Sequence, residues 1–186
     1  MKNALILHGT SSNPNQFWFP YLKTKLEEMG YKVTVPQLPD PDNPTLAAHI
    51  PFILDSYQFN SETVIIGHSA GACLILGILD AINVKIHQAI MVGGFLVSPD
   101  GSDHQIVKKI SDYNWSKMKQ NVGQMTIINS TNDPWGINDK SGRQLFEHIG
   151  DRLIIHHEGH MGSVSFNQPY PEFPLLVKLI ELAEVI

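Results

Sequence analysis

The chain has 186 residues, of which 42% are hydrophobic and 17% charged, a balance that favours a folded globule over a disordered chain. Its formal net charge is -5, and its lysines and arginines are few and scattered, so we expect no nucleic-acid partner. The single cysteine, Cys73, excludes a disulfide within the chain and a zinc site built from cysteines.

Membrane attachment is not indicated. No stretch approaches the ~18 apolar residues of a membrane span, and the apolar run from Ala4 to Leu7 is too short for a signal-peptide core. We therefore expect a cytoplasmic protein without membrane contact, and a single cysteine is compatible with a reducing compartment. No linker, repeat or low-complexity stretch divides the chain, so we expect one domain over residues 1–186.

The first half of the chain alternates short apolar runs with segments of helical length. Gly30 suits the left-handed position after a helix, and Pro51 can shift the start of the helix that contains it. In chain order, we expect a strand at Ala4–His8, a helix at Phe17–Met29, a strand at Lys32–Val35, a helix at Thr45–Tyr57, a strand at Thr63–Gly67, a helix at Ala70–Ile82 and a strand at His87–Val92.

The second half begins with residues 95–124, whose pattern is weak. They contain the turn signal Ser98-Pro99-Asp100-Gly101, and the run Phe95-Leu96-Val97 suits a flap over the site as well as it suits core packing. Short helices are possible at Ile106–Ile110 and Trp115–Met118, followed by a strand at Met125–Asn129, a helix at Lys140–Ile149, a strand at Leu153–His157 and a closing helix at Phe173–Ile186.

The predicted strands are continuous apolar runs, such as Thr63-Val64-Ile65-Ile66, which is typical of strands buried on both faces. Strands and helices alternate along the chain, which indicates right-handed crossovers. The sequence therefore predicts the α/β class: a three-layer α/β/α sandwich with about six mostly parallel strands and no cap domain.

The strongest motif is Gly67-His68-Ser69-Ala70-Gly71, which fits the nucleophile pattern G-x-S-x-G. A predicted strand enters it and a predicted helix leaves it, as the motif requires. The turn would hold Ser69 in a strained conformation, with small neighbours that avoid clashes. The N–H of Ala70, at the start of the helix, would stabilise an oxyanion.

A serine nucleophile needs a base and an orienting carboxylate, which in this fold follow in the order Asp or Glu, then His. Asp133 follows the strand Met125–Asn129, with Pro134 stiffening an Asx-type turn. Asp139 is the alternative carboxylate, although it suits the start of the next helix.

His160 is the predicted base, because it follows the last strand in a glycine-flanked loop. His156 and His157 compete, but they belong to the strand end itself. The same cluster lacks the H-E-x-x-H spacing of a zinc site, and the chain has neither a G-x-G-x-x-G motif nor a P-loop. We therefore expect no metal and no cofactor.

The second oxyanion donor should come from the loop after the first strand. Gly9 allows a tight turn there, which favours the N–H of Thr10, with Ser11 as the alternative. Among other residues, Trp18, Trp115 and Trp135 are candidates for an acyl pocket, although packing is the commoner role of each. Trp135 has the best functional case, and Cys73 should pack in the core.

These motifs resemble one family. His8-Gly9-Thr10, Gly67-His68-Ser69-Ala70-Gly71, Asp133-Pro134 and Gly159-His160 occur in the order seen in α/β-hydrolases. The short length and Phe17-Trp18-Phe19-Pro20 are similar to small serine hydrolases related to retinoblastoma-binding protein 9. The resemblance implies a six-stranded sheet that lacks the first two strands of larger relatives, with the triad Ser69, Asp133 and His160. It carries over no partner, because the L-x-C-x-E motif is absent.

The sequence thus predicts a serine hydrolase that cleaves small carboxylic esters, or thioesters or amides, through an acyl-enzyme on Ser69. A transferase or peptidase using the same serine stays open. The alternative from another class is a non-catalytic binding protein that keeps the fold. The substrate and any protein partner are not readable from the sequence.

Overall fold

The computed structural model describes residues 1–98 and 105–185. The predicted turn at Ser98-Pro99-Asp100-Gly101 therefore lies, apart from Ser98, outside the described residues. Six strands form one sheet in the order β2-β1-β3-β4-β5-β6, and every neighbouring pair is parallel. The strands are β1 (Asn3–Leu7), β2 (Lys32–Thr34), β3 (Thr63–His68), β4 (Ile86–Val92), β5 (Val122–Ser130) and β6 (Arg152–His156). The predicted six-stranded parallel sheet is confirmed.

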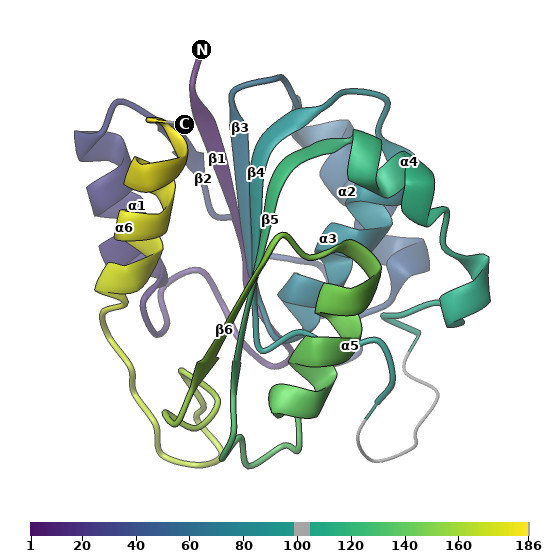
Figure 1. Cartoon of the computed structure of the whole chain (residues 1–186). Helices are drawn as coiled ribbons and strands as arrows, with labels where there is room; N and C mark the ends of the chain where they lie inside the picture. The colour runs from purple at the N-terminus through teal and green to yellow at the C-terminus, as the bar shows by residue number, and fades with distance from the viewer. Residues whose placement is uncertain (99–104, 186) are drawn as a thin grey trace.

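Helices cover both faces of this sheet (Figure 1). α1 (Phe19–Glu28) and α6 (Pro174–Ala183) lie together on one face. The other face carries α2 (Leu46–Ser56), α3 (Ala70–Ala81), α4 (Trp115–Gln120) and α5 (Asp139–Ile149). This is the expected α/β/α sandwich, because each crossover between parallel strands must lay its helix on a face of the sheet. That residues 1–186 form one domain stays a prediction.

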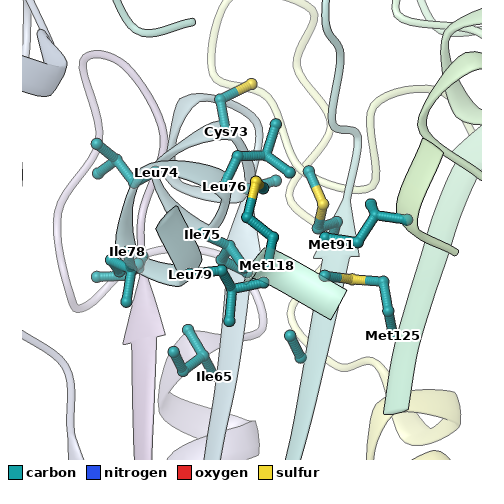
Figure 2. Packing of buried hydrophobic residues seen from close by; sticks show 14 of the residues in the cluster. Ile65, Cys73, Leu74, Ile75, Leu76, Ile78, Leu79, Met91, Met118 and Met125 are labelled. Carbon is teal, nitrogen blue, oxygen red and sulfur yellow. The ribbon is translucent and has the colours of Figure 1, made fainter. Parts of the chain in front are cut away.

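The core consists of two hydrophobic clusters separated by the sheet. Successive residues of β3 point to opposite faces: Ile65 belongs to the cluster under α3, and Val64 and Ile66 belong to the cluster under α1 and α6. Residues 70–79 of α3 are all buried. Figure 2 shows their side chains interleaved with methionines from β4, β5 and α4. The strand and helix on either side of Ser69 are thus fixed in the buried core.

Local sequence signals explain the helix ends. Gly30 has φ +85°, and the N–H groups of Gly30 and Tyr31 donate to the carbonyls of Glu27 and Leu26, which closes α1 in a Schellman motif. Thr45 caps α2, because its hydroxyl accepts from the Ala48 N–H at 3.1 Å. Pro51 does not shift the start of α2. It lies inside the helix on an exposed face, where water can reach the carbonyl that its ring leaves unpaired.

The weak segment before β5 differs from the prediction. No helix forms at Ile106–Ile110; a 3₁₀ turn follows instead at Ile110–Asp112. The Lys108 N–H donates to the Tyr113 hydroxyl at 3.0 Å, so this backbone group has a hydrogen-bond partner without forming a helix. β5 is longer than predicted, since it begins at Val122.

None of the described helices is long and apolar enough to cross a membrane.

Candidate active site

The loops after the strands meet above the carboxyl edge of the sheet, because all six strands point the same way. There they enclose an open cavity of about 770 Å³. Segments that follow every strand contribute to its wall, and the residues that line it include Thr10, Asp40, Ser69, Phe95, Trp135 and His160. The predicted nucleophile, base and first-strand loop therefore share one cavity. Phe95 lines this cavity and packs in the core together with Leu96, which is the packing alternative for their run; the flap stays a prediction.

The turn between β3 and α3 has the strained geometry expected for Ser69. Its φ is +56° and its ψ is -120°, values that cost an ordinary residue on the order of 1–3 kcal/mol. Glycine is required on either side by close approach: a Cβ at Gly71 would lie 2.3 Å from the Leu7 carbonyl oxygen, and one at Gly67 would lie 2.3 Å from that of Gly71. The Ser69 hydroxyl makes no cap hydrogen bond to α3, although Ser69 is the N-cap residue.

The loop after β1 lies directly against this serine. A Cβ at Gly9 would come within 2.9 Å of the Ser69 Cβ, so only glycine fits there. The N–H of Ser11 donates to the Pro41 carbonyl at 2.8 Å and is therefore already engaged. Of the two alternatives, this leaves Thr10, which lines the cavity. Ala70 is the first residue of α3, so its N–H has no acceptor within the helix.

Asp133 and His160 form a buried pair. The His160 Nδ1 lies 2.6 Å from the Asp133 Oδ2, and the two side chains are 5% and 0% exposed. The other carboxylate oxygen accepts from the Trp135 N–H at 2.8 Å, which is the predicted Asx-type turn. A carboxylate can only accept, so His160 donates from Nδ1, and Nε2 becomes the basic nitrogen of the ring.

The competing residues lie elsewhere. Asp139 is the first residue of α5, where its charge suits the helix dipole. His156 is the last residue of β6, and the His157 Nδ1 is 2.7 Å from the Thr131 hydroxyl. None of the three lines the cavity of Ser69. Among the residues that the structure describes, no group of three or more His, Cys, Asp or Glu side chains could hold a metal ion.

Residues 158–162, here called the base loop, are held by side chains from distant segments. Ser130 and Asn132, next to Asp133, accept from the N–H groups of Glu158 and Gly159 at 2.8 and 2.9 Å. The buried Trp18 donates from Nε1 to the Met161 carbonyl at 3.1 Å, so it anchors the base loop and does not line an acyl pocket. The loop that carries His160 is thus tied to the loop that carries Asp133.

His68 reaches the base loop from the nucleophile turn. Its Nε2 donates to the His160 carbonyl at 2.8 Å, and the two rings lie 4.8 Å apart between centroids. Burial, and to a smaller extent the neighbouring His160, lower the pKa of His68 to about 3. His68 is therefore neutral at physiological pH. No local signal in the sequence reveals this contact, because its partners lie 92 positions apart.

The remaining candidates have simple roles. Trp115 stacks on His148 away from the cavity, whereas Trp135 is 48% exposed, lines the cavity and packs edge-on against Phe166. Cys73 is buried and donates to the Phe95 carbonyl, and burial raises the pKa of its thiol to about 12. This is the packing role predicted for it.

A serine on a strained strand-to-helix turn, together with a buried His–Asp pair in the same cavity above a parallel sheet, is the arrangement of the α/β-hydrolase class. The family can be stated more narrowly. A family model described as serine hydrolase matches residues 4–178, so the chain belongs to this family and is a hydrolase.

Individual relatives agree with this assignment. Serine hydrolase RBBP9 of Rattus norvegicus is 23% identical over 154 residues, which cover 81% of each chain. YdeN of Bacillus subtilis is 28% identical over 100 residues, 52% of this chain and 53% of that protein. The crystal structure of the ydeN gene product superposes with a TM-score of 0.88 at 21% identity, covering 100% of both chains. The predicted resemblance to small serine hydrolases such as RBBP9 is confirmed.

Proposed function

We propose that this protein hydrolyses small carboxylic esters through an acyl-enzyme on Ser69, with His160 as general base and Asp133 as its orienting carboxylate. The observation that carries the proposal is the 2.6 Å contact between His160 Nδ1 and Asp133 Oδ2. It fixes the ring nitrogen that can accept a proton, in a cavity that the ring shares with Ser69.

The chemistry follows from these positions. As the Ser69 Oγ attacks the ester carbonyl carbon, His160 Nε2 takes the hydroxyl proton, and the N–H groups of Ala70 and Thr10 stabilise the oxyanion. The tetrahedral intermediate then breaks its bond to the alcohol oxygen, which receives the proton from His160. Water repeats the sequence on the acyl-enzyme, releasing the carboxylic acid and restoring the Ser69 hydroxyl.

The cavity supports substrates that are small and not anionic. Its volume of about 770 Å³ is open at the edge of the sheet. Within the part of the chain that the structure describes, its lining includes Asp40 and Asp42 but no lysine or arginine, so no cation is available to pair with an anionic substrate group. Thioesters and amides would follow the same steps.

Labelling with a fluorophosphonate probe tests the proposal directly, because the probe reacts only with an activated serine. We expect the purified protein to be labelled and the variants Ser69→Ala and His160→Ala to lose labelling. Matched controls are Ser61→Ala, an exposed serine before β3, and His157→Ala, the neighbouring histidine outside the cavity; both should label like the wild type. A folded wild-type protein that resists the probe would contradict the proposal and favour the binding-protein alternative.

A further inference from the structure

A short turn after the base loop forms one wall of the cavity. Ser163 and Gln168 pair through their backbones, with both N–H···O contacts at 2.8 Å. The turn between them, residues 163–168, is here called the lip. Ser163, Val164 and Ser165 of the lip line the cavity. The side chain of Gln168 leaves the lip in the other direction, toward the base loop.

Gln168 binds the base loop at several backbone groups. Its Oε1 accepts from the His160 N–H at 2.9 Å and from the Gly162 N–H at 3.3 Å. Its Nε2 donates to the Glu158 carbonyl at 2.5 Å. The fit is tight, since a Cβ at Gly159 would lie 2.7 Å from that nitrogen. One amide thus bridges both ends of the base loop.

The base loop has few backbone contacts of its own. It belongs to no helix or strand, and its own N–H···O contact, from Met161 to Glu158, is long at 3.3 Å. The two backbone polar groups of His160 are each held by a side chain: Gln168 takes the N–H, and His68 takes the carbonyl. Asp133 holds the ring of His160, whereas its backbone is held by two remote residues, one beside the nucleophile and one at the end of the lip.

We propose that Gln168 is a positioning residue that ties the lip to the general base, an inference that rests on the proposed function. Gln168 acts only through the backbone of the base loop. Losing its amide would release the His160 N–H and the Glu158 carbonyl together and let the loop drift. A displacement of about 1 Å at a catalytic group can cost on the order of 10²-fold in rate.

The test compares Gln168→Met, which keeps the length but makes no hydrogen bonds, with Gln168→Asn, which keeps the amide but is one methylene too short. For a short-chain ester, we expect kcat to fall by about 10- to 100-fold in both, in the range seen when residues that orient catalytic groups are removed. KM should change by less than about threefold, because the substrate does not touch Gln168. The matched control is Asn167→Gly. Asn167 is the exposed neighbour of Gln168, and its φ of +49° suits glycine. It should keep the wild-type kcat.

Two further readouts separate positioning from a general loss of structure. The rate of fluorophosphonate labelling should fall in step with kcat, and the downfield NMR signal of the hydrogen-bonded His160 Nδ1 proton should broaden or shift while the rest of the spectrum stays folded. Wild-type kcat and labelling in either folded Gln168 variant would overturn the inference and leave the proposed function standing. If the wild-type protein itself is not labelled, the proposed function fails instead.

Discussion

The nucleophile turn, residues 67–71, and the base loop carry the proposed nucleophile and the proposed general base, yet they are held in opposite ways. Residues 67–71 span the end of β3 and the start of α3 and are fixed by their own backbone, with glycines where no Cβ fits. Residues 158–162 lie beyond the last strand and are fixed by side chains from Trp18, His68, Ser130, Asn132 and Gln168.

This difference separates stability from activity. The nucleophile turn cannot change without disturbing the core, because residues 70–79 beside it are buried. The base loop can lose a contact and still leave the sheet intact, since its supports are single hydrogen bonds of about 1 kcal/mol each. We therefore expect substitution of Gly67 or Gly71 in the first region to destabilise or unfold the protein, and substitutions around the second region to leave it folded but slow.

The largest expected effect concerns activity. Asp133→Asn should lower kcat by about 10⁴-fold, because an amide can donate to His160 Nδ1 and so favour the wrong tautomer. The same substitution should have a much smaller effect on the free energy of unfolding than on the activation free energy. The matched control is Asp139→Asn, at the start of α5, which should keep kcat and lose a few tenths of a kcal/mol through the helix dipole. Steady-state ester kinetics measure both, and equal kcat values in the two variants would refute the assignment.

The second prediction concerns the fold. Gly71→Ala places a methyl group 2.3 Å from the Leu7 carbonyl oxygen. Neither β1, which carries this oxygen, nor α3 can shift to relieve the clash. We expect a loss of about 3 kcal/mol or more in the free energy of unfolding, or insoluble protein. Gly30→Ala is the control: its φ of +85° strains alanine, but nothing lies within 4 Å, so the loss should be about 1 kcal/mol. Denaturant unfolding of both would show whether the clash outweighs the strain.

The sequence predicted the locally determined parts of the molecule. The apolar runs placed the six strands, and Gly67-His68-Ser69-Ala70-Gly71 placed the turn, because those signals arise from neighbouring residues. The pairing of Asp133 with His160 followed from the order of the strands in this fold. Support for the base loop was not predicted: Gln168 and His68 act through contacts that form only when distant segments meet. The sequence already favoured Thr10 over Ser11, but it did not predict the contact that engages the Ser11 N–H with Pro41.

The smallest expected effect is on the pH dependence of stability, and it tests whether His68 stays neutral while it holds the base loop. Its folded pKa of about 3 lies below the unfolded value of 6.5, so the unfolded chain binds more protons between these pH values. Stability therefore falls as the pH drops below 6.5, by about 2 kcal/mol at about pH 5 for this residue. His68→Gln keeps an N–H donor for the His160 carbonyl but does not titrate. In urea titrations, the stability of His68→Gln relative to the wild type should rise by that amount as the pH is lowered from about 7.5 to 5. A difference that stays constant over this range would mean that His68 becomes protonated without cost and does not hold the loop as a neutral donor.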